Sequence, residues 1–185
     1  LSGLPEGIRA QAAAAARAKG MEGKWLFTMQ APSYFPFMTY ADNRALREKM
    51  FRGYSMRGNN GNEHDNNQIL ADIIRLRVEK ANLRVYKSHA AYVLERNMAK
   101  TPEKVLDFLG QIWEAALPVA KAEAAAQQEL IDREGGKFKL EPWDWFYYTE
   151  KIRKEKYDIS DEETRPYFSA KNVTDGMFYV ANRLY

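Results

Sequence analysis

The residues best suited to chemistry in this chain stand in one short polar stretch, where Glu63, His64 and Asp65 follow one another. Carboxylate and imidazole groups are common metal ligands and common general bases. Consecutive residues of a loop rarely converge on one ion, however, and the sequence holds only one other histidine, His89. We therefore expect a polar loop that leads into a helix rather than a metal site, and a polar contact at a helix start for His89.

Motifs of the common enzyme classes are missing from the sequence. It contains no His-Glu-x-x-His pattern, no glycine-rich phosphate loop and no Gly-x-Ser-x-Gly pattern. It contains no cysteine either, which excludes thiolate metal ligands and a cysteine nucleophile and is typical of a reducing compartment. The sequence motifs are therefore silent on chemistry, and they assign no residue to catalysis, to metal binding or to substrate binding.

Four basic residues gather between positions 150 and 158, beside a tyrosine that would suit a nucleic-acid contact. They are Lys151, Arg153, Lys154 and Lys156. Three carboxylates interrupt the run, and the net charge of the whole chain is only +3. We therefore interpret the run as a solvated helix face and expect no nucleic-acid partner. A free-standing helical interaction domain that binds nucleic acid through these charges is the alternative.

Another charged cluster combines Asp42, Arg44, Arg47 and Glu48. Opposite charges at these spacings can form a network on one short helix. Exposed ion pairs contribute only about 0 to 1 kcal/mol each to stability. We therefore interpret this cluster as a device that orients one helix against another.

Helical sequence patterns dominate the chain, including the segments that carry the residues named above. They predict helices over residues 5–19, 36–54, 65–86, 88–98 and 101–134, another that begins at Pro142, and a last one over 173–185. Thr101 and Pro102 suit the start of the long helix, Gly135 suits its end, and Pro118 predicts a kink inside it. Asp65 and Gln68 resemble a capping box. An apolar run at 25–29 allows at most one short strand, so the predicted fold is an all-α, irregular array of helices.

Length and composition indicate a globular protein without a membrane helix. The 185 residues include 45% apolar and 29% charged residues, and no apolar run approaches the ~18 residues that would span a bilayer. The chain begins with Leu1 and ends in a helical pattern, so we expect an excised piece of a longer protein. The cytoplasm is the expected location, and export of the longer protein is left open.

Three segments resemble the thimet-oligopeptidase family of zinc metallopeptidases. They are "ADNRALREKMFRGY" (41–54), "DNNQILADIIRLRVEKANLRVYKSHAAYVLERNMAKTPEKVLDFL" (65–109) and "PWDWFYYTEKIRKEKYDISDEETRPYF" (142–168). Within that family they look most like the bacterial peptidyl-dipeptidases, also called dipeptidyl carboxypeptidases. The resemblance runs over essentially the whole chain in the order of the family.

The resemblance implies a largely helical, two-lobed peptidase with a deep channel for short peptides. In this family a His-Glu-x-x-His helix and a later glutamate hold the zinc, and the resemblance places that helix beyond Tyr185. Residues 1–185 are then a single helical region of a larger catalytic domain, forming channel wall and scaffold. The longer protein, the parent, would need zinc and would remove C-terminal dipeptides from oligopeptides. Internal cleavage of oligopeptides is the alternative. Residues 1–185 alone would bind no zinc and would cleave no peptide.

The resemblance also indicates how the aromatic segment after Pro142 is packed. Five rings, those of Trp143, Trp145, Phe146, Tyr147 and Tyr148, would point in nearly every direction from a helix that turns about 100° per residue. We expect a helix packed on several sides, with most rings in the core and a partner for each indole N–H. Apolar faces that the rest of the parent would cover could instead drive self-association of residues 1–185. We expect no membrane partner.

Overall fold

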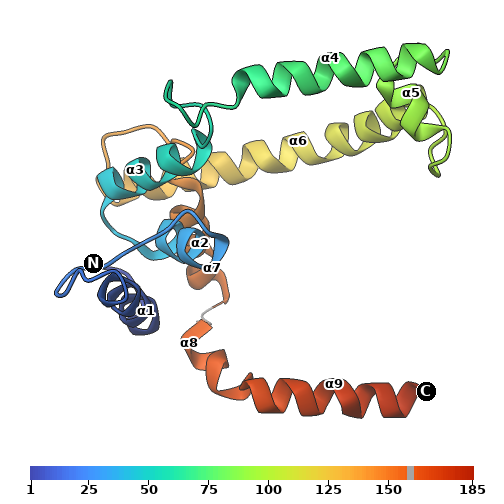
Figure 1. Ribbon diagram of the computed structural model, residues 1–185. Helices are drawn as coiled ribbons and strands as arrows, with labels where there is room; N and C mark the ends of the chain where they lie inside the picture. The colour runs from blue at the N-terminus through green and yellow to red at the C-terminus, as the bar shows by residue number, and fades with distance from the viewer. Residues whose placement is uncertain (158–160) are drawn as a thin grey trace.

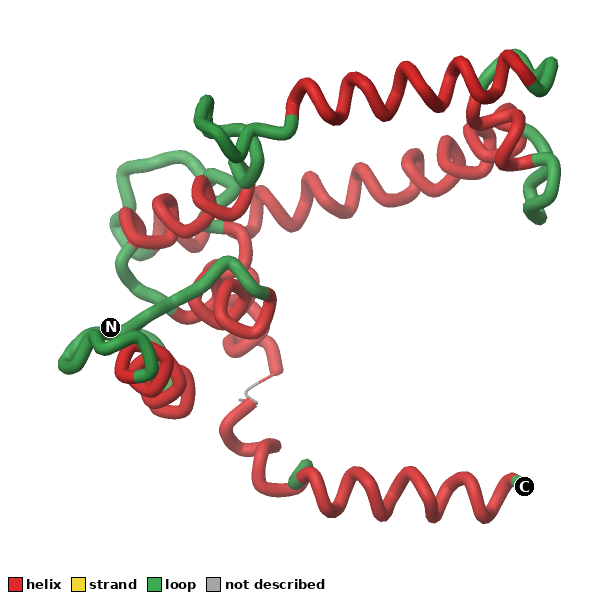
Figure 2. The backbone as a smooth tube through the Cα atoms, in the orientation of Figure 1, coloured by secondary structure: helices red, strands yellow, loops and turns green. Residues whose placement is uncertain are grey.

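The computed structural model describes residues 1–157 and 161–185, and every regular element within these ranges is helical (Figure 1, Figure 2). The predicted all-α class is confirmed. The elements are α1 (Glu6–Arg17), α2 (Ala31–Tyr40), α3 (Arg44–Ser55), α4 (Asn67–Leu83), α5 (His89–Leu94), α6 (Pro102–Arg133), α7 (Trp145–Tyr157), α8 (Asp161–Thr164), the 3-10 turn η1 (Arg165–Tyr167) and α9 (Ala170–Leu184). Residues 25–29 form no strand and lie beside α1, where Leu26 donates its backbone N–H to the carbonyl of Ala12 at 2.9 Å.

The main core lies where α2 packs against α3 and α7, with α1 on the other side of α2. Its buried side chains include Tyr34, Phe37, Met38 and Met50. A smaller cluster of Leu130, Ile131 and Tyr148 joins the C-terminal half of α6 to α7. The two clusters make α7 the common neighbour of the N-terminal helices and of α6.

The helix predicted over residues 36–54 is wrong, because the structure has two helices there. Ala41 leaves the helical conformation with a ψ of 119°, and the side chain of Asn43 accepts a hydrogen bond from the backbone N–H of Leu46 at 3.1 Å. Asparagine is a favoured N-cap, so it starts α3 as a separate helix. Apolar spacing did not reveal the break, because Met38 and Met50 on its two sides enter the same core.

The capping box predicted at Asp65 and Gln68 is also wrong. The carboxylate of Asp65 accepts hydrogen bonds from the backbone N–H groups of Gly61 at 2.9 Å and Asn67 at 3.3 Å. Gln68 donates to Asp72 instead of reaching back. In a loop rich in asparagine and glycine, local turns of this kind compete with the helix cap for the same carboxylate.

Both ends of α6 agree with the prediction. Thr101 accepts a hydrogen bond from the N–H of Lys104 at 3.4 Å, and Pro102 is the first helical residue. Gly135 follows the last turn with a φ of 80°, and Gly136 donates its N–H to the carbonyl of Ile131 at 2.8 Å. This is the pattern by which glycine ends a helix. The helix continues through Pro118 without interruption.

An arm projects from the core, formed by α4, α5 and the N-terminal half of α6 (residues 67–117; Figure 1). The helix α5 contacts both neighbours and reverses the chain, so that α4 and α6 run antiparallel. Many large apolar side chains of the arm are exposed, among them Ile69, Leu70, Ile74, Leu106, Phe108 and Trp113. The arm therefore presents apolar surface that the described residues do not cover.

The last helix, α9, extends away from the core (Figure 2). All of its residues are exposed. Val173, Met177, Val180 and Leu184 recur at three- and four-residue spacing and form an apolar stripe on it. Among the described helices, none combines the length and the apolar character that a membrane span requires.

Candidate functional site

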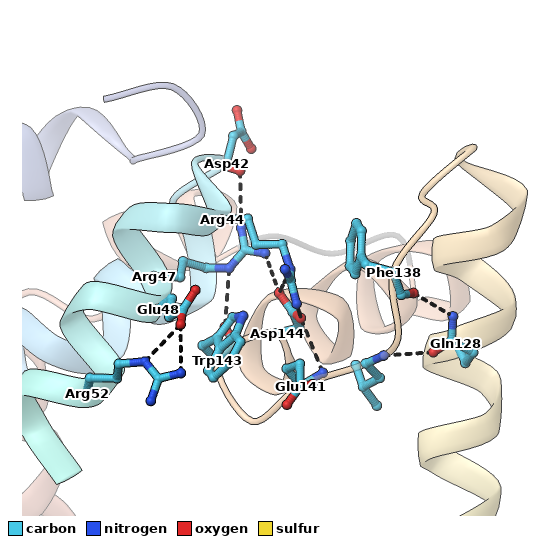
Figure 3. Close-up of polar contacts among 11 residues, drawn as sticks. Asp42, Arg44, Arg47, Glu48, Arg52, Gln128, Phe138, Glu141, Trp143 and Asp144 are labelled. Atoms are coloured by element: carbon cyan, nitrogen blue, oxygen red, sulfur yellow. Dashed lines mark hydrogen bonds and ion pairs between the residues drawn. The ribbon is translucent and has the colours of Figure 1, made fainter. Parts of the chain in front are cut away.

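Asp144, directly before α7, is the most enclosed charged group of the described chain, with 0% of its surface exposed. Its Oδ1 lies 2.8 Å from Nη2 of Arg47, and its Oδ2 lies 2.8 Å from Nη2 of Arg44 (Figure 3). The Nε of Arg44 adds contacts of 3.1 Å to both oxygens. Two guanidinium groups of α3 thus hold one carboxylate from a segment about one hundred residues further along the chain.

Arg47 is as deeply enclosed as its partner, with 1% of its surface exposed. Its Nη1 donates to the carbonyls of Ala41 at 2.8 Å and Asp42 at 3.1 Å, and its Nε donates to the carbonyl of Trp143 at 3.2 Å. The planar fork of an arginine can serve several acceptors at once, which a lysine cannot. One guanidinium therefore joins the loop between α2 and α3 to the loop before α7.

Local sequence explains how these groups face one another. Arg44 and Arg47 are three residues apart on α3, so they share one face of the helix. Asp144 closes a turn with Glu141, donating its N–H to the carbonyl of Glu141 at 2.9 Å and accepting the N–H of Glu141 at 3.2 Å. Residues 142–144 form this turn, so α7 begins at Trp145 and the predicted start at Pro142 is wrong.

The sequence expectation for the cluster at 42–48 is partly confirmed. Arg44 and Arg47 do orient α3 against another element, but through Asp144 rather than through their neighbours. Glu48 pairs with Arg52 at 2.8 Å on the exposed face of α3 (Figure 3). Sequence reasoning missed Asp144 because nothing local marks a carboxylate whose partners are distant in the chain.

The aromatic rings around Asp144 pack more loosely than predicted. Of the five, Tyr148 is buried, Phe146 is exposed and the others are half-buried. Trp143 contacts Phe51 edge to face, with ring centres 6.1 Å apart, and its indole N–H is buried without a hydrogen-bond partner among the described residues. The expectation of a partner for that indole N–H is wrong among the described residues. Guanidinium groups lie over the faces of the rings, Arg52 over Trp143 at 5.1 Å and Arg47 over Tyr147 at 4.0 Å, and such contacts leave an N–H in the ring plane unpaired.

A groove of about 910 Å³ lies beside this cluster, between the N-terminal residues, α1, α2 and α7. In its lining, the carboxylate of Asp42 accepts hydrogen bonds from the hydroxyls of Ser2 at 2.5 Å and Tyr147 at 2.9 Å. The bond from Ser2 lowers the pKa of Asp42, and burial raises the pKa of Tyr147. Although burial opposes it, the hydrogen bond to Glu134 raises the pKa of Lys151.

These shifts decide what the groove can do chemically. At neutral pH its lining presents an ionised carboxylate, a neutral phenol and an ammonium group, all of which can hydrogen-bond to a ligand. Their pKa values move away from neutrality, whereas a general acid or base works best when its pKa lies near the operating pH. These directions therefore do not favour proton transfer by the three groups.

The residues first considered for metal binding do not come together. His64 is exposed, and its Nε2 lies 3.6 Å from Glu63, while Asp65 is engaged with backbone N–H groups. His89 starts α5, where Ser88 caps the helix, and its Nδ1 is buried without a partner in the part of the chain that is described. Across residues 1–157 and 161–185, no three histidine, aspartate or glutamate side chains are arranged to hold a metal ion.

Ion pairs balance much of the charge in the basic run at 150–158. Lys151 contacts both carboxylate oxygens of Glu134 at 2.7 and 2.8 Å, and Arg153 contacts both oxygens of Glu150 at 2.7 Å. Glu155 in the same run pairs with Arg133 at 2.6 Å. These pairs join α7 to α6 or lie along α7, which favours the solvated helix face over a phosphate-binding surface.

Comparison with known proteins identifies a family that this sequence matches. The sequence pattern of peptidase family M3 matches residues 37–185. The chain is 42% identical over 189 residues to a protein of Escherichia coli named oligopeptidase A, a match that covers all of this chain and 28% of that protein. It is 36% identical to dipeptidyl carboxypeptidase of Escherichia coli, covering 27% of it. It is 37% identical to organellar oligopeptidase A, chloroplastic/mitochondrial, of Arabidopsis thaliana, covering 24% of it.

Proposed function

Since this chain belongs to peptidase family M3, we propose that it is one helical segment of a larger zinc-dependent peptidase that hydrolyses oligopeptides. The observation that carries the proposal is the family match over residues 37–185 together with coverage of the whole chain by the relatives. The chain spans about 28% of the length of the curated relatives it matches. We call the longer protein the parent.

Within the parent, residues 1–185 act as a scaffold and as part of the channel wall. The buried contacts of Asp144 with Arg44 and Arg47 support the scaffold role, because they fix α3 against the start of α7. The exposed apolar faces of the arm and of α9 support a position inside a larger protein, since soluble proteins rarely leave such surfaces uncovered. The groove beside Asp42 offers hydrogen-bonding groups of the kind that a peptide backbone requires.

We propose that residues outside 1–185 hold the zinc of the parent. The described side chains do not fit a zinc site, because their histidines stand apart and no set of three ligands converges. The family's His-Glu-x-x-His helix would supply the ligands and the general base. We propose the cytoplasm as the location of the parent.

Two modes of cleavage are candidates for the parent. Release of C-terminal dipeptides is supported by the 36% identity to a protein named dipeptidyl carboxypeptidase. The higher identity, 42%, to a protein named oligopeptidase A supports oligopeptides as substrates without a restriction to dipeptide release, and internal cleavage is the alternative mode. Both modes use the same zinc chemistry and differ in where the peptide is held relative to the metal.

Product analysis on the parent separates the two modes. A peptide with a free C-terminus and the same peptide with an amidated C-terminus are incubated with the parent, and the products are identified by mass spectrometry. Dipeptide release predicts sequential loss of two residues from the free form and little cleavage of the amidated form. Internal cleavage predicts the same internal products from both peptides. Failure of the parent to hydrolyse either peptide, with or without added zinc, would contradict the proposed function.

Residues 1–185 alone supply the matching negative control. We expect this segment to bind no stoichiometric zinc by metal analysis and to cleave neither peptide. Chelator-sensitive hydrolysis by the segment would contradict the assignment of a scaffold role to it.

A further inference from the structure

The far end of the arm carries apolar side chains that are almost completely exposed. We call residues 83–87, which begin with the last residue of α4, and residues 96–100, after α5, the arm tip. Leu83 is 86% exposed, Val85 is 93% exposed and Met98 is 99% exposed. The tip lies at the end of the arm that points away from the core (Figure 1). Nothing in the described part of the chain covers these side chains.

The same tip is strongly basic. Residues 83–100 contain four basic residues and a single acidic one, Glu95. The basic residues are Arg84, Lys87, Arg96 and Lys100. Glu95 accepts the hydroxyl of Tyr86, and Lys100 reaches only the carbonyl of Glu95, at 3.5 Å. No ion pair to these four cations occurs among the described residues, so positive charge and apolar surface coincide at the tip.

The backbone of the tip adds an independent observation. Val85 has a φ of 63°, in the left-handed region that favours glycine. Tyr86 donates its N–H to the carbonyl of Ala81 at 3.0 Å, and Val85 donates to Asn82 at 2.9 Å. This is the helix ending in which glycine normally occupies the position of Val85. A branched residue in this costly conformation, with its side chain in solvent, is a backbone outlier of the kind that occurs at functional surfaces.

We propose that the arm tip is a docking surface for an acidic, partly apolar surface of the parent outside residues 1–185. Opposite charge would select the partner, and Leu83, Val85 and Met98 would supply the buried contact. The inference rests on the proposed function in one respect, that residues 1–185 belong to a longer chain. The chain spans 28% of the length of its relatives, so most of the parent is available to meet the tip.

Other occupants fit the observations less well. A second copy would bring another basic tip or another chain of net charge +3 against the cations, and like charges oppose such contacts. An anionic lipid surface would explain the tip but not the exposed apolar side chains along the body of the arm, such as Ile74, Leu106 and Trp113. A protein surface that receives the arm accounts for both.

Zero-length carbodiimide coupling on the full-length parent tests the proposal. The reagent joins a lysine Nζ to a carboxylate only where the two are in contact, and mass spectrometry identifies the joined residues. We expect Lys87 and Lys100 to be joined to aspartate or glutamate residues outside 1–185. Mixing labelled and unlabelled parent before coupling shows whether each link lies within one chain or between two.

Charge reversal provides the matched variants. Arg84→Glu combined with Arg96→Glu should lower the yield of these links several-fold, because acidic residues at the tip repel an acidic partner. Lys19→Glu combined with Lys24→Glu makes the same change of charge on the exposed loop after α1 and should leave the yield unchanged.

Three results would overturn the proposal. They are links from the tip only to residues within 1–185, links only between labelled and unlabelled chains, and no link from either lysine in a folded parent. The result of the coupling experiment does not depend on catalysis. If the links form in a parent that fails to hydrolyse peptides, the docking surface is supported and the proposed peptidase function is refuted.

Discussion

The guanidinium of Arg47 and the carboxylate of Asp144 are 2.8 Å apart and both buried, although 97 positions separate them in the sequence. This pair connects α3, which contributes to the main core, to the beginning of α7. Buried ion pairs add little net stability compared with an apolar core, but removing one partner leaves an uncompensated charge. The pair therefore selects one arrangement of α3 and α7 over others.

Replacing Asp144 with alanine should destabilise the protein strongly. The change leaves Arg47 buried without a counter-charge and frees two N–H groups of Arg44, so we expect a loss of about 3 to 5 kcal/mol in the free energy of unfolding. Urea denaturation followed by circular dichroism measures it. Glu48→Ala, which breaks the exposed pair with Arg52, is the control and should cost less than about 1 kcal/mol. Equal losses in the two variants would show that Asp144 has no special structural role.

Lysine in place of Arg47 keeps the charge but removes the fork. A lysine at position 47 can reach Asp144 but cannot also donate to the carbonyls of Ala41 and Trp143. Each buried carbonyl left without a donor costs about 1 to 3 kcal/mol of stability. Arg44→Lys is the matched change at a side chain that is one-third exposed, where water can replace lost contacts. We expect a clearly lower urea midpoint for Arg47→Lys than for Arg44→Lys. The reverse order would show that the carbonyl contacts of Arg47 contribute little to stability.

The network of Asp42 predicts two limits on the pH range of stability. The pKa of Asp42 is lowered in the folded state, mainly by the hydrogen bond from Ser2, so its contribution is present above its unfolded pKa of 3.8 and is lost as the pH falls through the folded value. The pKa of Tyr147 is raised by burial and by the bond to Asp42, so its contribution is present below 10.0 and is lost as the pH rises through the folded value.

Ser2→Ala separates the acid limit from the alkaline one. Without the donor, the pKa of Asp42 moves back toward its usual value, so the difference in urea midpoint between wild type and variant should shrink below about pH 4. The alkaline decline should remain, because Tyr147 still donates to Asp42. A difference between the two proteins that is constant over the whole pH range would contradict the assigned cause.

Exposed apolar faces predict self-association of residues 1–185 in isolation. The stripe of α9 formed by Val173, Met177, Val180 and Leu184 is exposed, as is much of the arm. Sedimentation equilibrium should therefore report species larger than a monomer. Met177→Glu combined with Val180→Glu should shift the equilibrium toward the monomer, whereas Asn172→Glu, on the same helix but outside the stripe, should not. A segment that stays monomeric at all concentrations would contradict this.

Local signals and distant contacts differ in how far the sequence predicts them. Thr101, Pro102 and Gly135 act within one helical turn, and the structure has them where the sequence placed them. Asp144 could not be assigned, because its charge is balanced by residues about one hundred positions earlier. The break at Asn43 could not be recognised from the apolar spacing, because α2 and α3 place apolar residues in the same core and the spacing continues across the break. The family resemblance was carried by longer segments, which hold information that periodicity does not.

Two helix ends with the same hydrogen bonds allow a direct test of the strain at the arm tip. Val85 after α4 and Gly135 after α6 both have positive φ, and both are followed by an N–H that donates to a carbonyl five residues earlier. Val85→Gly should stabilise the protein by about 1 kcal/mol. The left-handed conformation costs a residue with a side chain about 1 to 2 kcal/mol, and the larger entropy that glycine loses on folding offsets part of the gain from removing this cost. Gly135→Ala should destabilise it by about 1 kcal/mol, since no residue other than its chain neighbours lies within 4 Å of the added methyl and the backbone conformation opposes the change. Thermal and urea denaturation measure both. If Val85→Gly is neutral or destabilising while Gly135→Ala has the expected cost, the valine is not strained, and the backbone argument for the docking surface fails.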